Sequence, residues 1–197
     1  YKLDTTVRSL KVEAGKTATL NVSDVPKVTE TLVDLFKIDM ETGKATAQGD
    51  AALAGAEFTW HYYDGLYTKD NLPEKATRSW VTKTVAEKSS DRSIHYVTKL
   101  ADIYKVSGDA FYTQNEKSVL PLGTLTVEET KAPDGYLMDG AYMQAGDSTE
   151  QIKGMYLTQI TEDGELAVLS GSNQYSVSDQ VIRGGVKIQK RDLETKD

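Results

Sequence analysis

The 197-residue chain contains no cysteine, so no disulfide can stabilise it, and a secreted β-protein of this composition would need another source of stability. Only two histidines are present, His61 and His95, and they lie too far apart in the sequence to suggest a zinc site. No apolar run reaches the length of a transmembrane helix, and no segment has the pattern of a signal peptide. These absences predict a chain without a metal, a cofactor or a membrane-inserted segment.

Positive charge is also in short supply, because 23 lysines and arginines stand against 30 aspartates and glutamates, for a net charge of -7. Nucleic-acid binding needs clustered basic residues, and no such cluster is present, so we expect no nucleic-acid partner. Neither a Ser/His/Asp arrangement nor a glycine-rich phosphate loop is recognisable. The acidic segments 39–43 and 161–165 lack the ligand spacing of calcium loops and are expected to be solvated turns.

Tyrosine, threonine and valine are plentiful, and these residue types favour β-strands over helices. A hairpin is expected around Asp163 and Gly164, and at most one short helix within 84–106. Alternating segments bounded by turn-forming residues predict strands at 31–39, 56–64, 123–130 and 173–179. Together these features predict an all-β chain folded as a β-sandwich.

Short segments of the chain recur at a spacing of roughly 150 residues, which is the size of one domain. Residues 1–4 resemble residues 136–139. The other matches pair Val22-Ser23-Asp24 with Val177-Ser178-Asp179, and Lys37, Asp39, Glu41 and Thr42 with Lys190, Asp192, Glu194 and Thr195. We therefore expect the tail of one unit at 1–28, a complete unit at 30–183, and the first strand of a following unit at 185–197.

Three predicted strands carry an apolar face that ends in an ionisable residue, because successive side chains of a strand point to opposite faces. On the other face of one of these strands, Thr124, Thr126 and Glu128 are expected to point to water. The inward faces are Val33, Leu35 and Lys37; Leu125, Val127 and Glu129; and Tyr175, Val177 and Asp179. Burying an unpaired charge is costly, so this pattern predicts a single buried cluster of complementary charges.

Such a cluster is either a salt-bridge network without a covalent bond or a reactive site. Burial favours a neutral amine, which is a nucleophile, and a protonated carboxylic acid, which is an electrophile. Lys37 could then condense with Asp179 while Glu129 passes protons to the departing water. Proximity in a folded core gives such a step an effective molarity of about 10⁵ M or more. Asn173 is an alternative acceptor, but it lies further back along its strand.

The motifs around these residues resemble one protein family. VEETKAPDGY at 127–136 is similar to the E-box of Cna B-type, or SpaA-type, domains of Gram-positive surface proteins and pilins. FKIDMETGKA at 36–45, followed by LAGAEF at 53–58, is similar to the opening strand of these domains, and YSVSD at 175–179 to the closing strand. The resemblance implies an immunoglobulin-like, prealbumin-like sandwich in which Lys37 and Asp179 form a spontaneous isopeptide bond catalysed by Glu129.

The resemblance further implies a structural stalk or adhesin module of an extracellular, cell-wall-attached protein, with neighbouring domains of the same chain as its partners and no enzymatic turnover. Residues 66–118 exceed a minimal domain of this type and are expected to form an inserted segment. The alternative is a ligand-binding adhesin module in which this segment contacts a host protein or glycan. An aromatic glycan surface could be formed by Trp60, His61, Tyr62, Tyr63, Tyr67 and Trp80. Alternation puts Trp60 and Tyr62 on one face, however, so half of this run is expected to lie in the core. The flanking Asp24 and Lys190 lack a nearby E-box and are predicted to stay unlinked.

Overall fold

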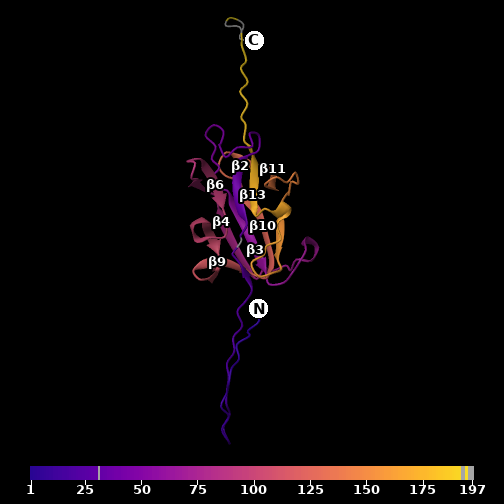
Figure 1. Cartoon of the computed structure of the whole chain (residues 1–197). Helices are drawn as coiled ribbons and strands as arrows, with labels where there is room; N and C mark the ends of the chain where they lie inside the picture. Colours follow the sequence, from indigo (N-terminus) through magenta and orange to yellow (C-terminus); the bar gives the residue numbers. More distant parts are fainter. Residues whose placement is uncertain (31, 192–193, 195–197) are drawn as a thin grey trace.

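The computed structural model describes residues 1–30, 32–191 and 194, so Asp192 and Thr195 of the repeat lie outside the described residues. Regular structure is almost entirely β, and two five-stranded sheets enclose one main apolar core (Figure 1). The predicted all-β sandwich is confirmed.

The first sheet is antiparallel throughout. Its strands, in spatial order, are β12 (Tyr156–Ile160), β10 (Gly123–Lys131), β3 (Glu57–Tyr63), β4 (Arg78–Lys83) and β7 (Lys105–Gly108). The second sheet is mixed, because its central strands β13 and β2 run parallel. Its order is β11 (Tyr136–Ala145), β13 (Gln174–Val181), β2 (Asp34–Asp39), β6 (Ile94–Thr98) and β5 (Val85–Lys88).

A small third sheet lies beside the sandwich, and three single turns of 3₁₀-helix complete the regular structure of the described residues. The third sheet has the order β1 (Val28–Thr29), β9 (Lys117–Pro121) and β8 (Tyr112–Gln114). The 3₁₀ turns are η1 (Lys69–Asn71), η2 (Asp102–Tyr104) and η3 (Leu169–Gly171).

Two local expectations are met only in part. The segment 84–106 folds mainly as β5, β6 and the beginning of β7, and its one short helix is the 3₁₀ turn η2. Strand β6 lies beside β2 through the pairs Leu35–Thr98 and Phe36–Val97. The turn at Asp163 and Gly164 forms, but only its first arm is a strand. In the returning residues 165–168, Ala167 N donates a hydrogen bond to Gln159 O of that strand at 2.8 Å.

Residues 66–118, expected to be an inserted segment, form strands of the sandwich. They supply β4 and β7 to one sheet, where β4 lies beside β3. They supply β6 and β5 to the other sheet, where β6 lies beside β2. Both sheets are therefore widened along one edge. The segment consequently contributes to the core as well as to the surface.

The predicted inward residues Leu35, Val127 and Val177 lie in the main core and are almost fully buried. The core also contains Trp60, Tyr62 and Trp80, each no more than 1% exposed. The expectation that Trp60 and Tyr62 lie in the core is confirmed, and with Trp80 they cannot form a surface for glycans. Their burial follows from the alternation of β3 and from the position of β4 beside it.

The expectation that Thr124 and Thr126 face water is wrong, since both are buried. The segment that follows β3 covers the outer face of β10 at Thr124. The Thr124 hydroxyl accepts a hydrogen bond from Tyr67 N at 2.8 Å and donates one to Gly65 O at 2.7 Å. Alternation assigned the correct face to these threonines but could not reveal that another segment covers it.

The turn after β10 explains part of the E-box sequence. Tyr136 N donates to Pro133 O at 3.1 Å, which closes a four-residue turn. Gly135 has a φ of +83°, and a Cβ at this position would lie 2.6 Å from the Cβ of Ala51. Only glycine fits both the conformation and the close approach. The turn leads the chain from β10 in one sheet to β11 in the other.

Candidate functional site

Lys37, Glu129 and Asp179 come from the three central strands β2, β10 and β13. In the parallel ladder, Lys37 lies opposite Val177, and Asp179 is the next residue on the same face of β13. Glu129 reaches the same place from the facing sheet. The structure thus brings together the three side chains that the sequence singled out.

The Lys37 amine is within contact distance of both carboxyl groups. Its Nζ lies 2.7 Å from Glu129 Oε1 and 2.6 Å from Glu129 Oε2, and it donates hydrogen bonds to both. Its distance to Asp179 Oδ1 is 2.7 Å. The ring of Phe58 approaches from the core side, with its centroid 5.9 Å from Nζ. One amine therefore has two carboxyl groups as its neighbours.

The cluster is removed from solvent. The side chains of Lys37 and Asp179 are 0% exposed and that of Glu129 is 5% exposed. Burial raises the pKa of the Glu129 carboxyl to about 8; nearby Lys37 opposes this shift and Asp179 reinforces it. Glu129 is therefore mostly protonated at neutral pH, when it can both donate and accept a proton.

Asp179 is in an unusual position for a buried carboxyl group. Although its Oδ1 is close to the Lys37 amine, neither of its oxygens has a hydrogen bond of regular geometry to any described residue. A buried acceptor without hydrogen bonds costs roughly 1–3 kcal/mol, and more when it is charged. A reaction that converts this carboxylate into a neutral amide would remove much of that cost.

A cavity of about 90 Å³ adjoins Glu129. It is lined mainly by apolar side chains of β11 and its neighbours, including Met143, Ile152 and Val177. This volume is more than enough for a water molecule. Water released next to Glu129 would therefore have a place to go.

A second buried carboxylate, Asp39, lies two residues beyond Lys37 on the same face of β2 and was missed in the sequence. Strand alternation could have found it. Its oxygens accept hydrogen bonds from Gln48 Nε2 at 3.0 and 3.1 Å, from Thr42 N at 2.8 Å and from the Tyr136 hydroxyl at 2.9 Å. Burial alone raises the pKa of Asp39, but these hydrogen bonds outweigh burial and lower it overall. The prediction that 39–43 is wholly a solvated turn is thus wrong at its first residue.

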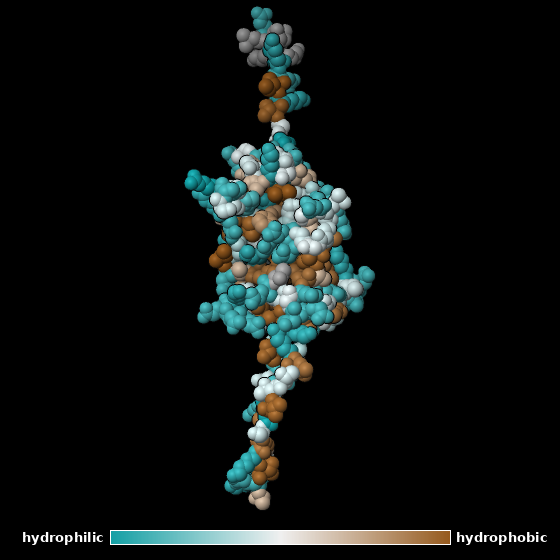
Figure 2. All heavy atoms as spheres, viewed as in Figure 1, coloured by the Kyte–Doolittle hydropathy of each residue, from teal (hydrophilic) through white to brown (hydrophobic). Residues whose placement is uncertain are grey.

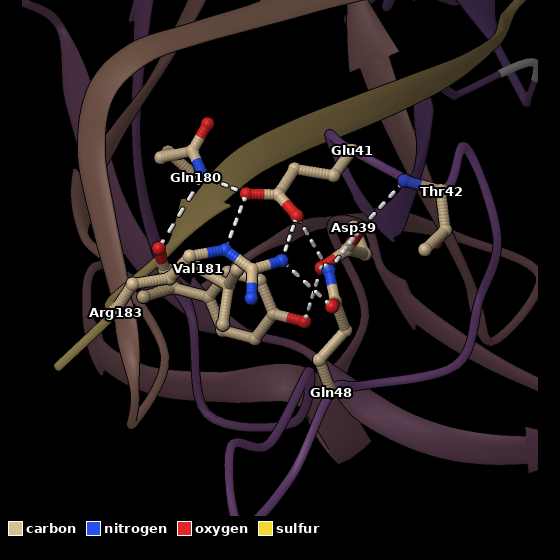
Figure 3. A network of polar contacts seen from close by, with 8 residues as sticks. Asp39, Glu41, Thr42, Gln48, Gln180, Val181 and Arg183 are labelled. Carbon is tan, nitrogen blue, oxygen red and sulfur yellow. Dashed lines mark hydrogen bonds and ion pairs between the residues drawn. The ribbon is translucent and has the colours of Figure 1, made fainter. Parts of the chain in front are cut away.

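Figure 3 shows that Asp39 belongs to a larger polar network at the end of the sandwich where β13 ends. Glu41 accepts hydrogen bonds from Gln48, Gln180 and Arg183. The hydrogen bond from Arg183 is the largest of the effects that lower the pKa of Glu41 to about 2. The network joins the turn after β2 to the first residues after β13.

The remaining sequence candidates lie elsewhere. The Asn173 side chain donates to Leu32 O at 2.6 Å and is not part of the cluster. His61 contacts Ser79 at 2.8 Å and His95 contacts Ser93 at 2.8 Å. Within the described part of the chain, no group of three or more His, Cys, Asp or Glu residues is arranged to hold a metal ion.

Comparisons with protein-family models and with curated proteins find no match to this chain. Over the residues that the structure describes, no helix is long and apolar enough to cross a membrane. The function must therefore be inferred from the geometry of the site.

Proposed function

We propose that this chain is a structural stalk or adhesin module of a bacterial cell-surface protein, locked by an isopeptide bond between Lys37 and Asp179. Glu129 is the catalytic residue of this single condensation, and the module turns over no substrate. The observation that carries the proposal is the buried contact of one amine with two carboxyl groups at 2.6–2.7 Å. A Cna B-type, immunoglobulin-like topology and an extracellular, cell-wall location belong to the same proposal.

The condensation can be written with its protons balanced. Glu129, protonated at neutral pH, gives its proton to Asp179 and then accepts one from the Lys37 ammonium. The neutral Nζ attacks Cγ of Asp179 and forms the new C–N bond. Glu129 donates a proton to the leaving hydroxyl and recovers one from the nitrogen as the C–O bond breaks. The products are an amide, one water and a protonated Glu129, as at the start.

Three properties of the site favour this reaction over a permanent salt-bridge network. The reacting groups are held in contact by central strands, so the step is effectively unimolecular. Asp179 has the Lys37 amine 2.7 Å from its Oδ1 but no regular hydrogen bond from the described residues, so the attacking nitrogen is its nearest polar neighbour. The cavity beside Glu129 can take up the water that leaves. A salt-bridge network would need none of these.

The position of the bond suits a load-bearing module. The chain enters the sandwich at β1 and β2 and leaves it after β13, and the N-terminal arm and the C-terminal segment project from opposite ends of the sandwich (Figure 1). Lys37 and Asp179 lie on adjacent parallel strands. A force applied to the two ends would pass from β2 to β13 through the bond and bypass residues 38–178. Unfolding under load would then require breaking a covalent bond.

The alternative function, ligand binding through residues 66–118, has weaker support. Much of this segment forms strands of both sheets, and Trp80 within it is buried. The segment still presents exposed apolar residues such as Ile94 and Ile103. These two lie on different elements, β6 and η2.

The test is the intact mass of the purified chain beside those of Glu129→Ala and Asp179→Ala. The parent is expected to be lighter than its calculated mass by one water, and both variants to show their full calculated masses. Because Lys37 also contacts Glu129, the Asp179→Ala variant distinguishes the two acceptors. If it still lacks one water, the bond joins Lys37 to Glu129 and the assignment of roles is wrong.

Glu128→Ala is the matched control, since Glu128 is adjacent to Glu129 and alternates to the other face of β10. It is expected to lack one water, as the parent does. A parent of full calculated mass would refute the proposed bond and leave the cluster as a salt-bridge network.

A further inference from the structure

The cavity beside Glu129 lies where β11 bulges away from β13. Between the pairs Leu137–Gln180 and Tyr142–Ser178, β11 advances by five positions and β13 by only two. A bulge of this kind bends one strand away from its partner, and bulges are common next to reactive sites. The bulge and the two positions that follow it supply one wall of the cavity, with Met138, Ala141, Tyr142 and Met143. The irregular strand thus leaves room beside the reactive carboxyl group.

The chain that follows β11 returns to this room and narrows it. Met143 and Ile152 form an isolated antiparallel bridge, in which each backbone N donates to the carbonyl oxygen of the other at 2.8 Å. The two hydrogen bonds fix the place of Ile152 beside β11. Its side chain packs against the main core and lines the cavity. The returning segment therefore adds one aliphatic side chain to the wall of the cavity.

Ile152 also lines a second space, a cleft of about 520 Å³. The cleft has exposed residues in its wall, among them Glu150, Gln151 and Lys153, so water enters it freely. Of the described residues that line the cleft, only Ile152 lines the cavity as well. The Ile152 side chain is therefore the wall that the cavity and the cleft share.

The surroundings of Glu129 differ in polarity from the outside of the molecule. Hydrophilic residues, in teal, make up most of the sandwich surface on the face that Figure 2 shows. The cavity wall, by contrast, is mainly apolar. An apolar layer thus separates the Glu129 carboxyl group from the water outside.

The groups that face Glu129 make its hydration important. Lys37 of β2 and Asp179 of β13 are its charged neighbours, Tyr142 of β11 is a titratable residue in the cavity wall, and Phe58 is its uncharged partner on β3. Burial is the largest of the effects that raise the pKa of Glu129 to about 8; Lys37 opposes it and Asp179 reinforces it. Water beside the carboxyl group would offset part of its desolvation and favour its ionised form.

We propose that Ile152 is a water barrier for the reactive site and thereby sets the upper pH limit of bond formation. The inference rests on the proposed condensation of Lys37 with Asp179, in which Glu129 must carry a proton to the leaving oxygen. The cavity takes up the single water that the reaction releases, and Ile152 keeps the water of the cleft away from Glu129 until then. Ile152 has no reactive group and acts only through Glu129, so it is a positioning residue.

The test compares the pH dependence of bond formation in the parent chain and in Ile152→Ala. The truncation joins the cavity to the cleft, so water reaches Glu129 and favours its ionised form. The rate is measured by time-resolved intact mass as chains isolated unlinked in denaturant refold. In Ile152→Ala it is expected to fall at a pH that is lower than in the parent by about one pH unit or more. An unchanged upper limit overturns the proposal.

Leu169→Ala is the matched control. Leu169 is another partly buried aliphatic residue that packs against the core and lines the cleft, but it is not among the described residues that line the cavity. This variant should keep the upper limit of the parent. So should Ile152→Val, which retains most of the side-chain volume. A limit lowered equally in either control would indicate a general loosening of the fold and would overturn the proposal.

A second measurement does not need the bond to form. In Asp179→Ala chains, which lack the acceptor, the pKa of Glu129 is measured by NMR titration with and without Ile152→Ala. We expect the truncation to lower this pKa by about one pH unit or more, and an equal value overturns the water barrier. If Ile152→Ala fails to fold, Ile152→Thr takes its place, because it keeps the branched shape of Ile152→Val but puts a hydroxyl group in the wall.

The two measurements separate this inference from the proposed function. A parent chain of full calculated mass refutes the bond, while the titration still decides whether Ile152 shields Glu129 from water. A linked parent whose Glu129 titrates alike with and without the truncation refutes the water barrier alone.

Discussion

Replacing Glu129 by glutamine should leave the sandwich folded but unlinked, and should lower its free energy of unfolding by about 5 kcal/mol. The figure is the loss of loop-closure entropy for a cross-link between Lys37 and Asp179, worked from the length of chain between them with the model used for disulfides. Glutamine has nearly the shape of glutamate and still accepts a hydrogen bond from Lys37. The direct effect on the folded state should therefore be about 1 kcal/mol, which is smaller than the entropic effect.

The assay is equilibrium unfolding in guanidinium chloride, followed by the fluorescence of Trp60 and Trp80, which are both buried in the core. Intact mass is measured on the same samples. The parent should also show a smaller dependence of the unfolding free energy on denaturant, because a cross-linked unfolded chain exposes less surface. Glu128→Gln is the matched control and should behave like the parent.

Two outcomes would refute this reasoning. A Glu129→Gln chain that still lacks one water would show that the carboxyl group is not needed for the bond. A linked parent and an unlinked variant of equal stability would show that the cross-link does not constrain the unfolded chain as the entropy model requires.

Three further predictions concern the site and its surroundings. Burial raises the pKa of Glu129 to about 8, so above about pH 8 Glu129 loses the proton that it gives to the leaving oxygen. The rate of bond formation on refolding an unlinked chain should therefore fall above about pH 8. Time-resolved intact mass measures this rate, and a rate that keeps rising with pH would contradict the acid role of Glu129. Asp179→Asn should lose ammonia in place of water and reach the same final mass as the linked parent, since both routes give the same amide; a variant that keeps its full calculated mass would count against Asp179 as the acceptor. Arg183→Ala should raise the pKa of Glu41 from about 2 toward the ordinary range, as followed by an NMR titration, and an unchanged pKa would show that the neighbouring glutamines suffice.

Much of the site could be predicted because a strand places alternate side chains on one face. That rule selected Lys37, Glu129 and Asp179 as inward residues without any knowledge of which strands are neighbours. The same rule was sufficient to find Asp39, which was nevertheless overlooked because its turn seemed solvated. It failed for Thr124, since whether the outer face of a strand is covered depends on a segment that packs there from elsewhere in the chain.

The segment 84–106 shows another limit of local patterns. The expected short helix is present only as the single 3₁₀ turn η2, and most of the segment is strand because β6 pairs with β2. Pairing between distant strands therefore overrode a weak local preference. Residues 66–118, expected from their length to be an inserted segment, supply strands that extend both sheets, and their pairing partners lie in other parts of the chain.

The sequence by itself determined the class of fold, the strands that carry the reactive residues and the faces on which those residues lie, because each of these depends on local alternation and turn chemistry. Only the tertiary structure decided that β2 and β13 run parallel as neighbours and that β10 faces them, so that one amine meets two carboxyl groups. It also decided that Asp179 is buried without regular hydrogen bonds from the described residues. Distances and desolvation arise from contacts between remote segments, and a pattern that is local in the sequence does not contain them.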